Sequence, residues 1–434
     1  MKFDNIENMK LGYFLGNFSP AIYKSEHVEM AIKKYRFGNY DGGYYRKFDT
    51  EIFLILSGKI EFNGNILAKG DMVKYDPGEV KHLFPLEDSE CLVIRFPGTK
   101  KDLYYEDEYN LELLNNMFNN IAKELSKDAR LRLPSKSEPV RSEDVSVVVQ
   151  GAINKNLTPL CLKSIRKCLP DAKIILSTWE GSNIENLEFD EVVLNKDPGA
   201  LECNIRKEYP IINNGNRQLV SVQQGLKRVR TKYALKMRTD LAMLGDDILF
   251  YFNSFPKRTD DFKLFKSRVI VGELFTRHNF HFFTQGEWHS VPKPFHPSDW
   301  FMFGETEDLR TYFEDTPLIP DEDMSNYLLK YPERCYNNKY PWSWRYATEQ
   351  YYCYEAFKRK FPEIKFDDWT DWDDERIIIS EKFIKNNFII LNMIEHKICN
   401  LKYMTACFRN WGLNNEEKDL MDNQEFMDYY NSLA

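Results

Sequence analysis

Arg238 and Asp240 stand two positions apart, directly after a short segment, residues 233–237, that is apolar except for one lysine. This pattern predicts a largely buried β-strand. In an open α/β sheet, ligands bind beyond the carboxyl ends of the strands, and a carboxylate there can hold a metal-bound phosphate. Arginine can itself neutralise a diphosphate. The sequence therefore predicts phosphate chemistry here, with Asp240 as a nucleotide or metal contact and a purely structural role as its alternative.

Other predicted strands of this half end in residues suited to a nucleotide. Gln150 and Gly151 end one strand, and a glycine allows close approach of the backbone to a ligand. Trp179 and Glu180 end the next, where an indole can stack on a base and a carboxylate can accept ribose hydroxyls. Asp197 lies in a turn after a third strand. We expect these strand ends to share one cleft, although turn formation and sheet covering also explain the same residue types.

The strand at residues 233–237 follows a predicted helix that starts in an asparagine-rich segment. Leu219, Val222, Leu226 and Val229 recur at steps of three and four residues, so one face of the helix would pack on the sheet. In its first turn, Asn216 and Arg217 are further candidates for nucleotide contacts, with Arg217 as a second cation for a diphosphate.

Later in the chain, three residues are candidates for transferring a proton to or from a reacting group. His296 and Asp299 lie on a proline-constrained loop, and Glu349 lies in the first turn of a helix predicted over residues 347–361. A first-turn carboxylate also favours the helix dipole, which is the structural alternative for Glu349. We take Asp299 as the first choice for the base.

Four histidines, at positions 278, 281, 289 and 296, fall close together in the sequence. Their spacing matches no established zinc signature and no cysteine accompanies them, so a structural zinc site is not the favoured interpretation.

These candidates need two kinds of scaffold. From residue 145 onward, predicted strands alternate with helices, which is typical of a parallel sheet with crossover helices. Residues 29–97 instead contain short strands separated by turns, including a hairpin at Asn63-Gly64, and predict a small β-sandwich or barrel. We expect an all-β domain over residues 1–105, a helix and proline-containing linker over 106–144, and an α/β domain over 145–434.

The composition narrows the class of protein. A net charge of -8 and a pI near 5.6 disfavour a broad nucleic-acid-binding face. The eight cysteines form no CxxC pair, and no signal core or long apolar run is present, so we expect a cytoplasmic protein with reduced thiols. Residues 377–411 mix apolar, basic and aromatic residues. They would form either a final packing layer or a contact with the inner face of the cytoplasmic membrane.

Part of the first half, YYRKFDTEIFLILSGKIEFNG followed by GDMVKYDPGEVKHLF, resembles the two motifs of the cupin family. Cupins are small β-barrels in which three histidines and a glutamate bind one metal. Glu51 matches the glutamate and His82 the second-motif histidine, whereas Tyr44 and Arg46 replace the other two histidines. Because Arg46 would repel a metal, we expect no metal, a pocket lined by Glu51 and His82, and a role in sugar binding, dimerisation or stability. The resemblance also implies a homodimer.

The second half resembles the WavE-type lipopolysaccharide synthesis family through the blocks SVVVQG, KIILSTWEGS, FDEVVLNKDPG, NNGNRQ, KYALKMRTDL and PFHPSDWFMFG. The resemblance implies a glycosyltransferase with a GT-A-like, Rossmann-type mixed-sheet domain, here preceded by the cupin-like barrel. GT-A enzymes carry a DxD motif whose carboxylates hold Mg²⁺ or Mn²⁺. Arg238-Thr239-Asp240 stands at that position, so Asp240 is the acidic ligand that remains.

The expected function is transfer of a sugar from a nucleotide-sugar donor to a lipopolysaccharide or capsular polysaccharide acceptor. One alternative is transfer of a phospho-type substituent to a polysaccharide through the same cleft. The other is a non-catalytic sugar-binding scaffold, which the replacements at Tyr44, Arg46 and Arg238 would permit.

Overall fold

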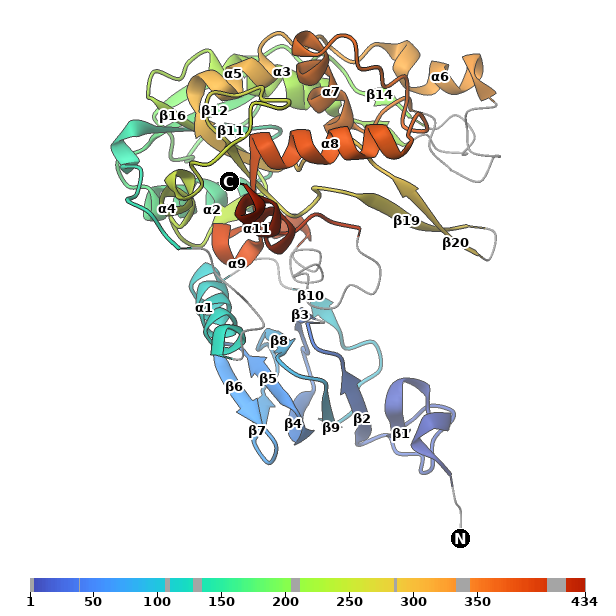
Figure 1. The fold of residues 1–434 in the computed structure, drawn as a ribbon. Coiled ribbons are helices and arrows are strands. Elements are labelled where there is room, and N and C mark those ends of the chain that lie inside the picture. Colours follow the sequence, from blue (N-terminus) through green and yellow to red (C-terminus); the bar gives the residue numbers. More distant parts are fainter. Residues whose placement is uncertain are drawn as a thin grey trace. The chain divides into compact units, whose positions relative to one another are not determined.

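The computed structural model describes residues 4–38, 40–105, 110–127, 135–203, 211–284, 287–332, 344–403 and 419–433 (Figure 1). The chain divides into two compact units. The first comprises Met1–Leu133 and Tyr403–Asn414, and the second comprises Pro134–Lys402 and Asn415–Ala434.

The first unit contains two five-stranded antiparallel sheets. One has the order β1-β2-β9-β4-β7, formed by β1 (Tyr13–Leu15), β2 (Glu29–Tyr35), β9 (Ser89–Phe96), β4 (Thr50–Ser57) and β7 (Met72–Tyr75). The other has the order β10-β3-β8-β5-β6, formed by β10 (Tyr104–Tyr105), β3 (Asp41–Tyr45), β8 (Lys81–Pro85), β5 (Lys59–Phe62) and β6 (Asn65–Ala68). The prediction of a small all-β unit is confirmed.

Alternating apolar residues of the strands form the core of this unit, as expected when each strand turns one face inward. The buried cluster includes Phe53 and Ile55 of β4 with Ile60 and Phe62 of β5. Asn63 and Gly64 both have positive φ, 44° and 87°, and join β5 to β6 as the predicted hairpin turn. Helix α1 (Leu111–Lys127) packs on β5 and β6 through residues spaced three and four apart: Leu114, Met117, Phe118, Ile121 and Leu125.

The second unit is built on a seven-stranded mixed sheet of order β13-β12-β11-β16-β21-β18-β22. Its strands are β11 (Val145–Gln150), β12 (Lys173–Trp179), β13 (Glu191–Asn195), β16 (Tyr233–Arg238), β18 (Val269–Gly272), β21 (Phe301–Glu305) and β22 (Phe388–Leu391). β13, β12, β11 and β16 are parallel, whereas β21 runs antiparallel to both β16 and β18. The chain builds outward from β11 to β13 and then returns to add β16 on the other side of β11. This reversal of strand order lies between β11 and β16, and the predicted α/β class is confirmed.

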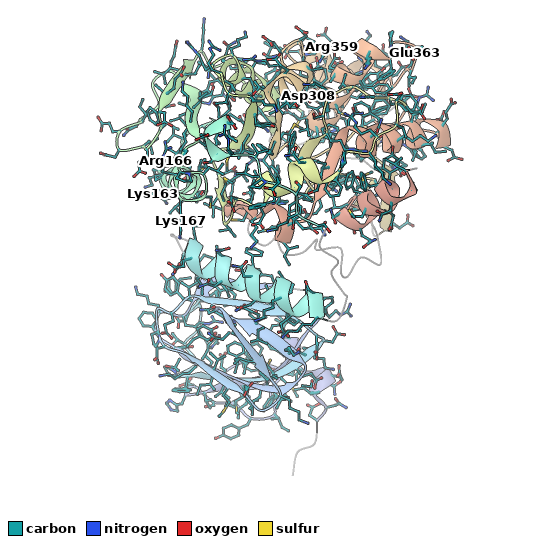
Figure 2. All side chains as sticks on the ribbon, turned by 60° about the vertical axis from the view of Figure 1, so that its left-hand side comes forward. Lys163, Arg166, Lys167, Asp308, Arg359 and Glu363 are labelled. Carbon is teal, nitrogen blue, oxygen red and sulfur yellow. The ribbon has the colours of Figure 1, made fainter. Side chains whose placement is uncertain are left out.

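Helices flank this sheet. They are α2 (Leu157–Cys168), α3 (Gly215–Leu226), α5 (Thr306–Phe313), α7 (Thr348–Lys360), α8 (Asp374–Asn387) and α11 (Asn423–Ser432). α3 packs on β11, β12 and β13, and α8 and α11 pack on β22. α2 buries Cys161, Leu162 and Ile165, while Lys163, Arg166 and Lys167 lie on its outer side (Figure 2). The helix predicted to reach Val229 ends at Leu226, although Val229 is still buried.

Short elements complete the unit. Three two-stranded pairs are β14 (Leu201–Glu202) with β15 (Ile212–Asn213), β17 (Leu241–Met243) with β23 (Ile398–Asn400), and β19 (Asn279–Thr284) with β20 (Glu287–Pro292). The short helices are α4 (Ile248–Tyr251), α6 (Ser325–Lys330) and α9 (Met393–His396). Within the segment 377–411, β22 and β23 are fully buried, whereas Ile378 of α8 is 53% exposed. Among the described residues, no helix has the length and apolar character needed to cross a membrane.

Candidate functional site

Most of the predicted site residues lie at one edge of the large sheet. β11 ends at Gln150, which is in register with Arg238 at the end of the parallel strand β16. Asp299 and Trp300 precede the antiparallel strand β21, whose first residue Phe301 pairs with Met237. Asp299 therefore reaches the same edge as Arg238. This edge holds the carboxyl ends of the parallel strands at the point where strand order reverses, which is where α/β proteins bind ligands.

Arg238 and Asp240 form a two-pronged ion pair. The guanidinium donates from Nε to Oδ1 of Asp240 over 2.9 Å and from the second terminal nitrogen to Oδ2 over 2.6 Å. The same guanidinium lies 5.8 Å from the centre of the Trp300 ring. Because both carboxylate oxygens accept from Arg238, the pair presents a guanidinium, rather than an open carboxylate, to an anion.

Asp299 is buried beside two polar side chains. Its Oδ2 accepts a hydrogen bond from Nε2 of Gln218 over 2.6 Å, and its backbone carbonyl oxygen accepts one from the ammonium of Lys236. Burial, and then the nearby carboxylate of Glu349, raise the pKa of Asp299 above its usual value, whereas Lys236 and Arg238 oppose the rise. The carboxylate of Glu349 is thus close enough to Asp299 to disfavour its charged form.

His296 lies next to the same pair. Its Nε2 is 3.8 Å from Oε2 of Glu349, and its Nδ1 is 3.1 Å from the backbone oxygen of Phe275. Burial, together with the positive charges of Arg277 and Lys293, lowers the pKa of His296 to about 3, so the ring is neutral at pH 7. A carbonyl can only accept, so Nδ1 carries the proton and Nε2 faces Glu349 with its lone pair. The three residues predicted for proton transfer thus come together.

The sequence did not assign roles to three residues of this cluster: Lys236, Gln218 and Lys293. Lys236 and Lys293 are buried, and burial lowers their pKa values to about 8 and about 7. For Lys236, the sequence signal that could have identified it was a lysine inside an apolar strand. For Gln218, the signal was a polar residue on the sheet-facing side of a helix, three positions before Ser221.

The other predicted nucleotide contacts are placed differently from the central cluster. Gln150 accepts from the hydroxyl of Ser221 over 2.8 Å, and the amide of Asn216 bonds both the N–H and the oxygen of Ile319. These two amides therefore have structural partners. Gly151 has a φ of 121°, which favours glycine, and the added Cβ of any other residue would lie 3.4 Å from Oγ1 of Thr239.

Asp197 and Arg217 form an ion pair at the edge next to β13. Arg217 donates to both oxygens of Asp197, each over 2.8 Å, and hydrogen bonding to Arg217 lowers the pKa of Asp197. Trp179 is half-buried and Glu180 exposed at the end of β12, two strands from β16. All four residues lie at this edge of the sheet. Among the described residues, no hydrogen bond or ion pair joins them to Arg238 or Asp240.

The donor set at Asp240 does not fit a divalent metal ion as it stands. Mg²⁺ and Mn²⁺ favour several oxygen ligands, but both oxygens of Asp240 bond Arg238. Within the part of the chain that the structure describes, no group of three or more histidine, cysteine, aspartate or glutamate side chains is arranged to hold a metal.

The histidines considered for zinc do not gather into one site. His278 lies between Glu381 and Glu425, at 3.1 Å from Nδ1 and 2.9 Å from Nε2, whereas His296 lies beside Glu349. His289 sits on β20, and the side chain of His281 lies outside the described residues.

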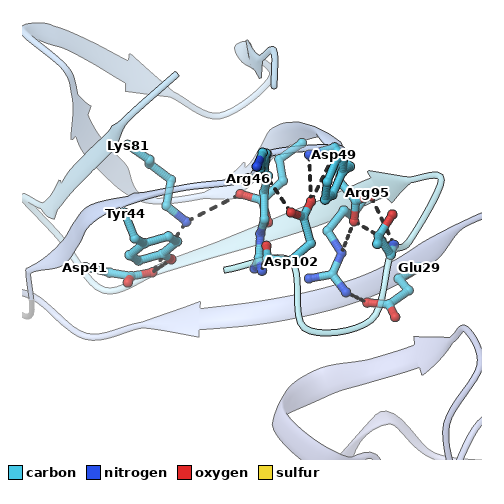
Figure 3. A network of polar contacts seen from close by, with 12 residues as sticks. Glu29, Asp41, Tyr44, Arg46, Asp49, Lys81, Arg95 and Asp102 are labelled. Atoms are coloured by element: carbon cyan, nitrogen blue, oxygen red, sulfur yellow. Dashed lines mark hydrogen bonds and ion pairs between the residues drawn. The ribbon is translucent and has the colours of Figure 1, made fainter. Parts of the chain in front are cut away.

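In the first unit, Glu51 belongs to a buried charge network, of which Figure 3 labels Arg46, Lys81 and Asp41. Its carboxylate is 3.1 Å from Nε of Arg46 and 3.8 Å from the ammonium of Lys81. Lys81 also lies 3.7 Å from the carboxylate of Asp41 and 4.4 Å from the centre of the Tyr44 ring. Two cations at the glutamate make this donor set unsuitable for a metal cation.

The expectation that Glu51 and His82 line one pocket needs correction. Lys81, not His82, faces Glu51 from β8. Neighbouring residues of a strand point to opposite faces, so His82 is turned the other way, where its Nδ1 is 2.5 Å from the hydroxyl of Tyr40. A shift of one residue in the match to the cupin motif exchanges the two side chains.

The mixed sheet and the polar edge at its strand reversal define an α/β unit, which is joined to a small all-β unit. Residues 145–414, more than half of the chain, match the family described as WavE lipopolysaccharide synthesis. The chain belongs to this family, which implies a biosynthetic enzyme with a role in lipopolysaccharide synthesis. A search of curated proteins found no match.

Three solved structures resemble a small part of the chain. One is an uncharacterized conserved protein with a double-stranded β-helix domain from Klebsiella pneumoniae, at 15% identity over 19% of this chain and 71% of that chain, with a TM-score of 0.18. A protein from Planctomyces limnophilus shares 20% identity over 18% and 71% of the two chains, with a TM-score of 0.16. KdgF from Halomonas sp. shares 17% identity over 18% and 74%, with a TM-score of 0.16. Likeness at these scores says nothing about ligand or activity.

Proposed function

We propose that the second unit is a glycosyltransferase that moves a sugar from a nucleotide-sugar donor to the saccharide of a lipopolysaccharide or capsular polysaccharide acceptor. The observation that carries the proposal is the placement of Arg238 and Asp299 at one sheet edge, at the strand reversal, with the carboxylate of Glu349 close to Asp299. The family supports a biosynthetic role on lipopolysaccharide, and the GT-A-like interpretation accounts for a donor site at this edge.

On the donor side, Arg238 would bond the diphosphate of the nucleotide sugar. A guanidinium matches phosphate oxygens with two parallel hydrogen bonds and stabilises the negative charge that grows as the diphosphate leaves. Asp240 would hold Arg238 in place in the free protein. We propose that transfer relies on Arg238 for this charge and proceeds without Mg²⁺ or Mn²⁺, since the donor set around Asp240 does not fit such an ion.

On the acceptor side, Glu349 would accept the proton. The acceptor hydroxyl oxygen forms a bond to the anomeric carbon, the bond from that carbon to the diphosphate oxygen breaks, and the hydroxyl proton passes to the carboxylate. The sequence favoured Asp299 as base, but Asp299 is 5% exposed and its pKa is raised, whereas the side chain of Glu349 is 21% exposed. Because the Glu349 side chain is the more accessible of the two, it can reach an acceptor hydroxyl, and we propose it as the base.

The test begins with thermal-shift screening of the full chain against UDP-, GDP-, CDP- and dTDP-sugars, with and without Mn²⁺. The proposal expects one nucleotide sugar to raise the unfolding temperature and then to be turned over when a saccharide acceptor is added. Glu349→Gln should lower kcat about 100-fold or more while retaining donor binding, as expected for loss of a general base. Arg238→Ala should weaken donor binding, and exposed Arg228→Ala serves as the matched control.

The two alternatives give different results in the same assay. Release of a nucleoside monophosphate with transfer of a phosphate-containing group would establish the phospho-type reaction and overturn sugar transfer. A saccharide that binds, without stabilisation by any of the four nucleotide sugars, would support the non-catalytic scaffold instead.

A further inference from the structure

We infer that the first unit carries a ligand site of its own, a groove between β6 and β7 that binds the pyranose rings of a saccharide. β6 ends one sheet of the unit and β7 ends the other, so the sandwich is open between them. The groove there has a volume of about 630 Å³, which is within the range of small-molecule sites. His82 of the cupin motif lines this groove but Glu51 does not, so the groove is not the pocket that the motif predicts, and the family match of residues 145–414 does not extend to it.

The floor of the groove is apolar. Phe62 and Tyr75 belong to the buried core of the unit, and Leu67 and Val73 pack against that core while remaining partly exposed. Sugar rings carry faces of C–H groups that lose contact with water favourably on such a surface. A floor of this kind does not stabilise a strongly charged ligand.

The rim supplies hydrogen-bonding groups of both kinds. Asn65 and Asn110 are amides, Lys74 donates, and Glu79 accepts. Some of these groups already have one local partner: Lys74 pairs with Asp76 at 2.7 Å, and one oxygen of Glu79 accepts from the backbone N–H of Asp76 over 2.7 Å. Each retains further donor or acceptor positions, as neighbouring hydroxyls on a sugar require.

The charges of the rim select against anionic ligands. Among the residues that line the groove, Lys74 supplies one ammonium and Glu79 one carboxylate, and His82 also lines it. A diphosphate or phosphorylated sugar would meet Glu79 without a compensating cluster of cations. A neutral saccharide matches both the apolar floor and the balanced rim.

The groove is distinct from the charge network of this unit. The residues that line it do not include Arg46, Glu51 or Lys81. Arg46 and Lys81 each pair with Glu51, so the network and the groove are separate features. Changes to the groove can therefore leave the network intact.

The identity of the saccharide rests on the proposed function. If the second unit transfers sugar to a polysaccharide, a saccharide site in the first unit would retain the acceptor between encounters with the donor. Retention raises the local concentration of acceptor at the second unit without any new contact there. The binding itself requires no nucleotide sugar.

Saturation-transfer NMR on the full chain tests the site. The probes are glucose, galactose, mannose, N-acetylglucosamine and the core oligosaccharide released from lipopolysaccharide by mild acid. At least one probe should give a saturation signal. Met72→Trp should weaken its binding at least tenfold, because Met72 is 68% exposed, lines the groove and would place an indole across it.

The control is Lys69→Trp, which adds the same side chain at an exposed position beside β6 that does not line the groove. Both variants should unfold at the temperature of the unmodified chain. Absence of any signal, or binding equally strong in Met72→Trp, would overturn the inference. Binding that Met72→Trp removes, in a chain that turns over no nucleotide sugar, would contradict only the proposed function. Sugar transfer by a chain with no probe bound at the groove would contradict only the saccharide site.

Discussion

The side-chain ammonium of Lys236 donates a hydrogen bond to the backbone carbonyl oxygen of Asp299. Lys236 lies in the middle of β16 with none of its surface exposed, and burial lowers its pKa to about 8. Its charge favours the carboxylate form of Asp299, which burial disfavours. A residue that cannot touch a ligand thus influences both the position and the protonation of a candidate active-site carboxyl group.

Replacing Lys236 by Met should change how stability depends on pH. A lysine whose folded pKa lies below its unfolded value contributes stability above the unfolded pKa, and that contribution is lost as pH falls through the folded pKa. For Lys236 the window runs from about 10.5 down to about 8. Between pH 7 and pH 10.5, the free energy of unfolding of the unmodified chain should therefore rise by on the order of 3 kcal/mol relative to that of Lys236→Met. Denaturant unfolding at the two pH values measures this difference.

The exposed Lys227→Met is the control, and its difference from the unmodified chain should change little over the same range. A gap between the unmodified chain and Lys236→Met that stays constant with pH would show that Lys236 does not carry a buried charge.

His278 should contribute stability in the opposite direction. Burial disfavours its charged form, but hydrogen bonds to Glu381 and Glu425 outweigh burial and raise its pKa to about 9. A raised pKa gives stability that is complete below the unfolded value of about 6.5 and lost as pH rises through about 9. His278→Gln should therefore destabilise the chain at pH 6 by on the order of 2–3 kcal/mol, with most of that difference gone at pH 10.

Thermal unfolding at a series of pH values measures this effect. Exposed His27→Gln provides the control for loss of a histidine. Equal effects of His278→Gln at pH 6 and pH 10 would mean that packing, rather than the two ion pairs, explains the contribution of His278.

Features set by a few neighbouring residues could be predicted from the sequence. Asn63-Gly64 specifies its hairpin because both residues tolerate positive φ, and residues 233–237 specify a buried strand by their apolar character. The edge that holds Arg238 follows from the order of strands and helices. Contacts between distant segments, such as Gln218 with Asp299 and His278 with Glu425, leave no comparable local pattern.

The error at His82 has a physical cause of the same kind. Because side chains alternate along a strand, a motif match that is shifted by one residue selects the opposite face. Lys81 and His82 are both buried, so polarity could not distinguish the side facing Glu51 from the side facing Tyr40.

Glu61 should limit the stability of the first unit at alkaline pH. It lies on β5, the strand on which α1 packs, and burial raises its pKa to about 8, while its Oε1 accepts from the backbone N–H of Gly64 over 2.5 Å. The stabilising contribution of protonated Glu61 is fully present below pH 4.5, the unfolded pKa, and is lost as the pH rises through about 8. Glu61→Gln should therefore be more stable than the unmodified chain at pH 9, by about 1–3 kcal/mol, and should show little advantage at pH 5.

Hydrogen exchange at the amides of α1 reports on this unit directly. Glu112→Gln, on the exposed side of the same helix, is the control. At each pH the exchange rate of Glu61→Gln is compared with that of the unmodified chain. If the substitution slows exchange more at pH 5 than at pH 9, ionisation of Glu61 is not the cause of the effect.

Arg238 should determine whether this edge of the sheet binds a metal ion. In Arg238→Asp, two carboxylates would flank Thr239, and Asp240 would lose the guanidinium that now bonds both of its oxygens. Oxygen ligands of this kind suit Mn²⁺, so the variant should bind Mn²⁺ at least tenfold more tightly than the unmodified chain. Electron paramagnetic resonance of free Mn²⁺ measures this without an activity assay.

Arg238→Asn separates the two causes, because it removes the cation without adding a carboxylate and should bind less Mn²⁺ than Arg238→Asp. Equal affinity in the unmodified chain and Arg238→Asp would show that the ion pair does not exclude a metal, and the donor site would then have to be assigned a metal after all.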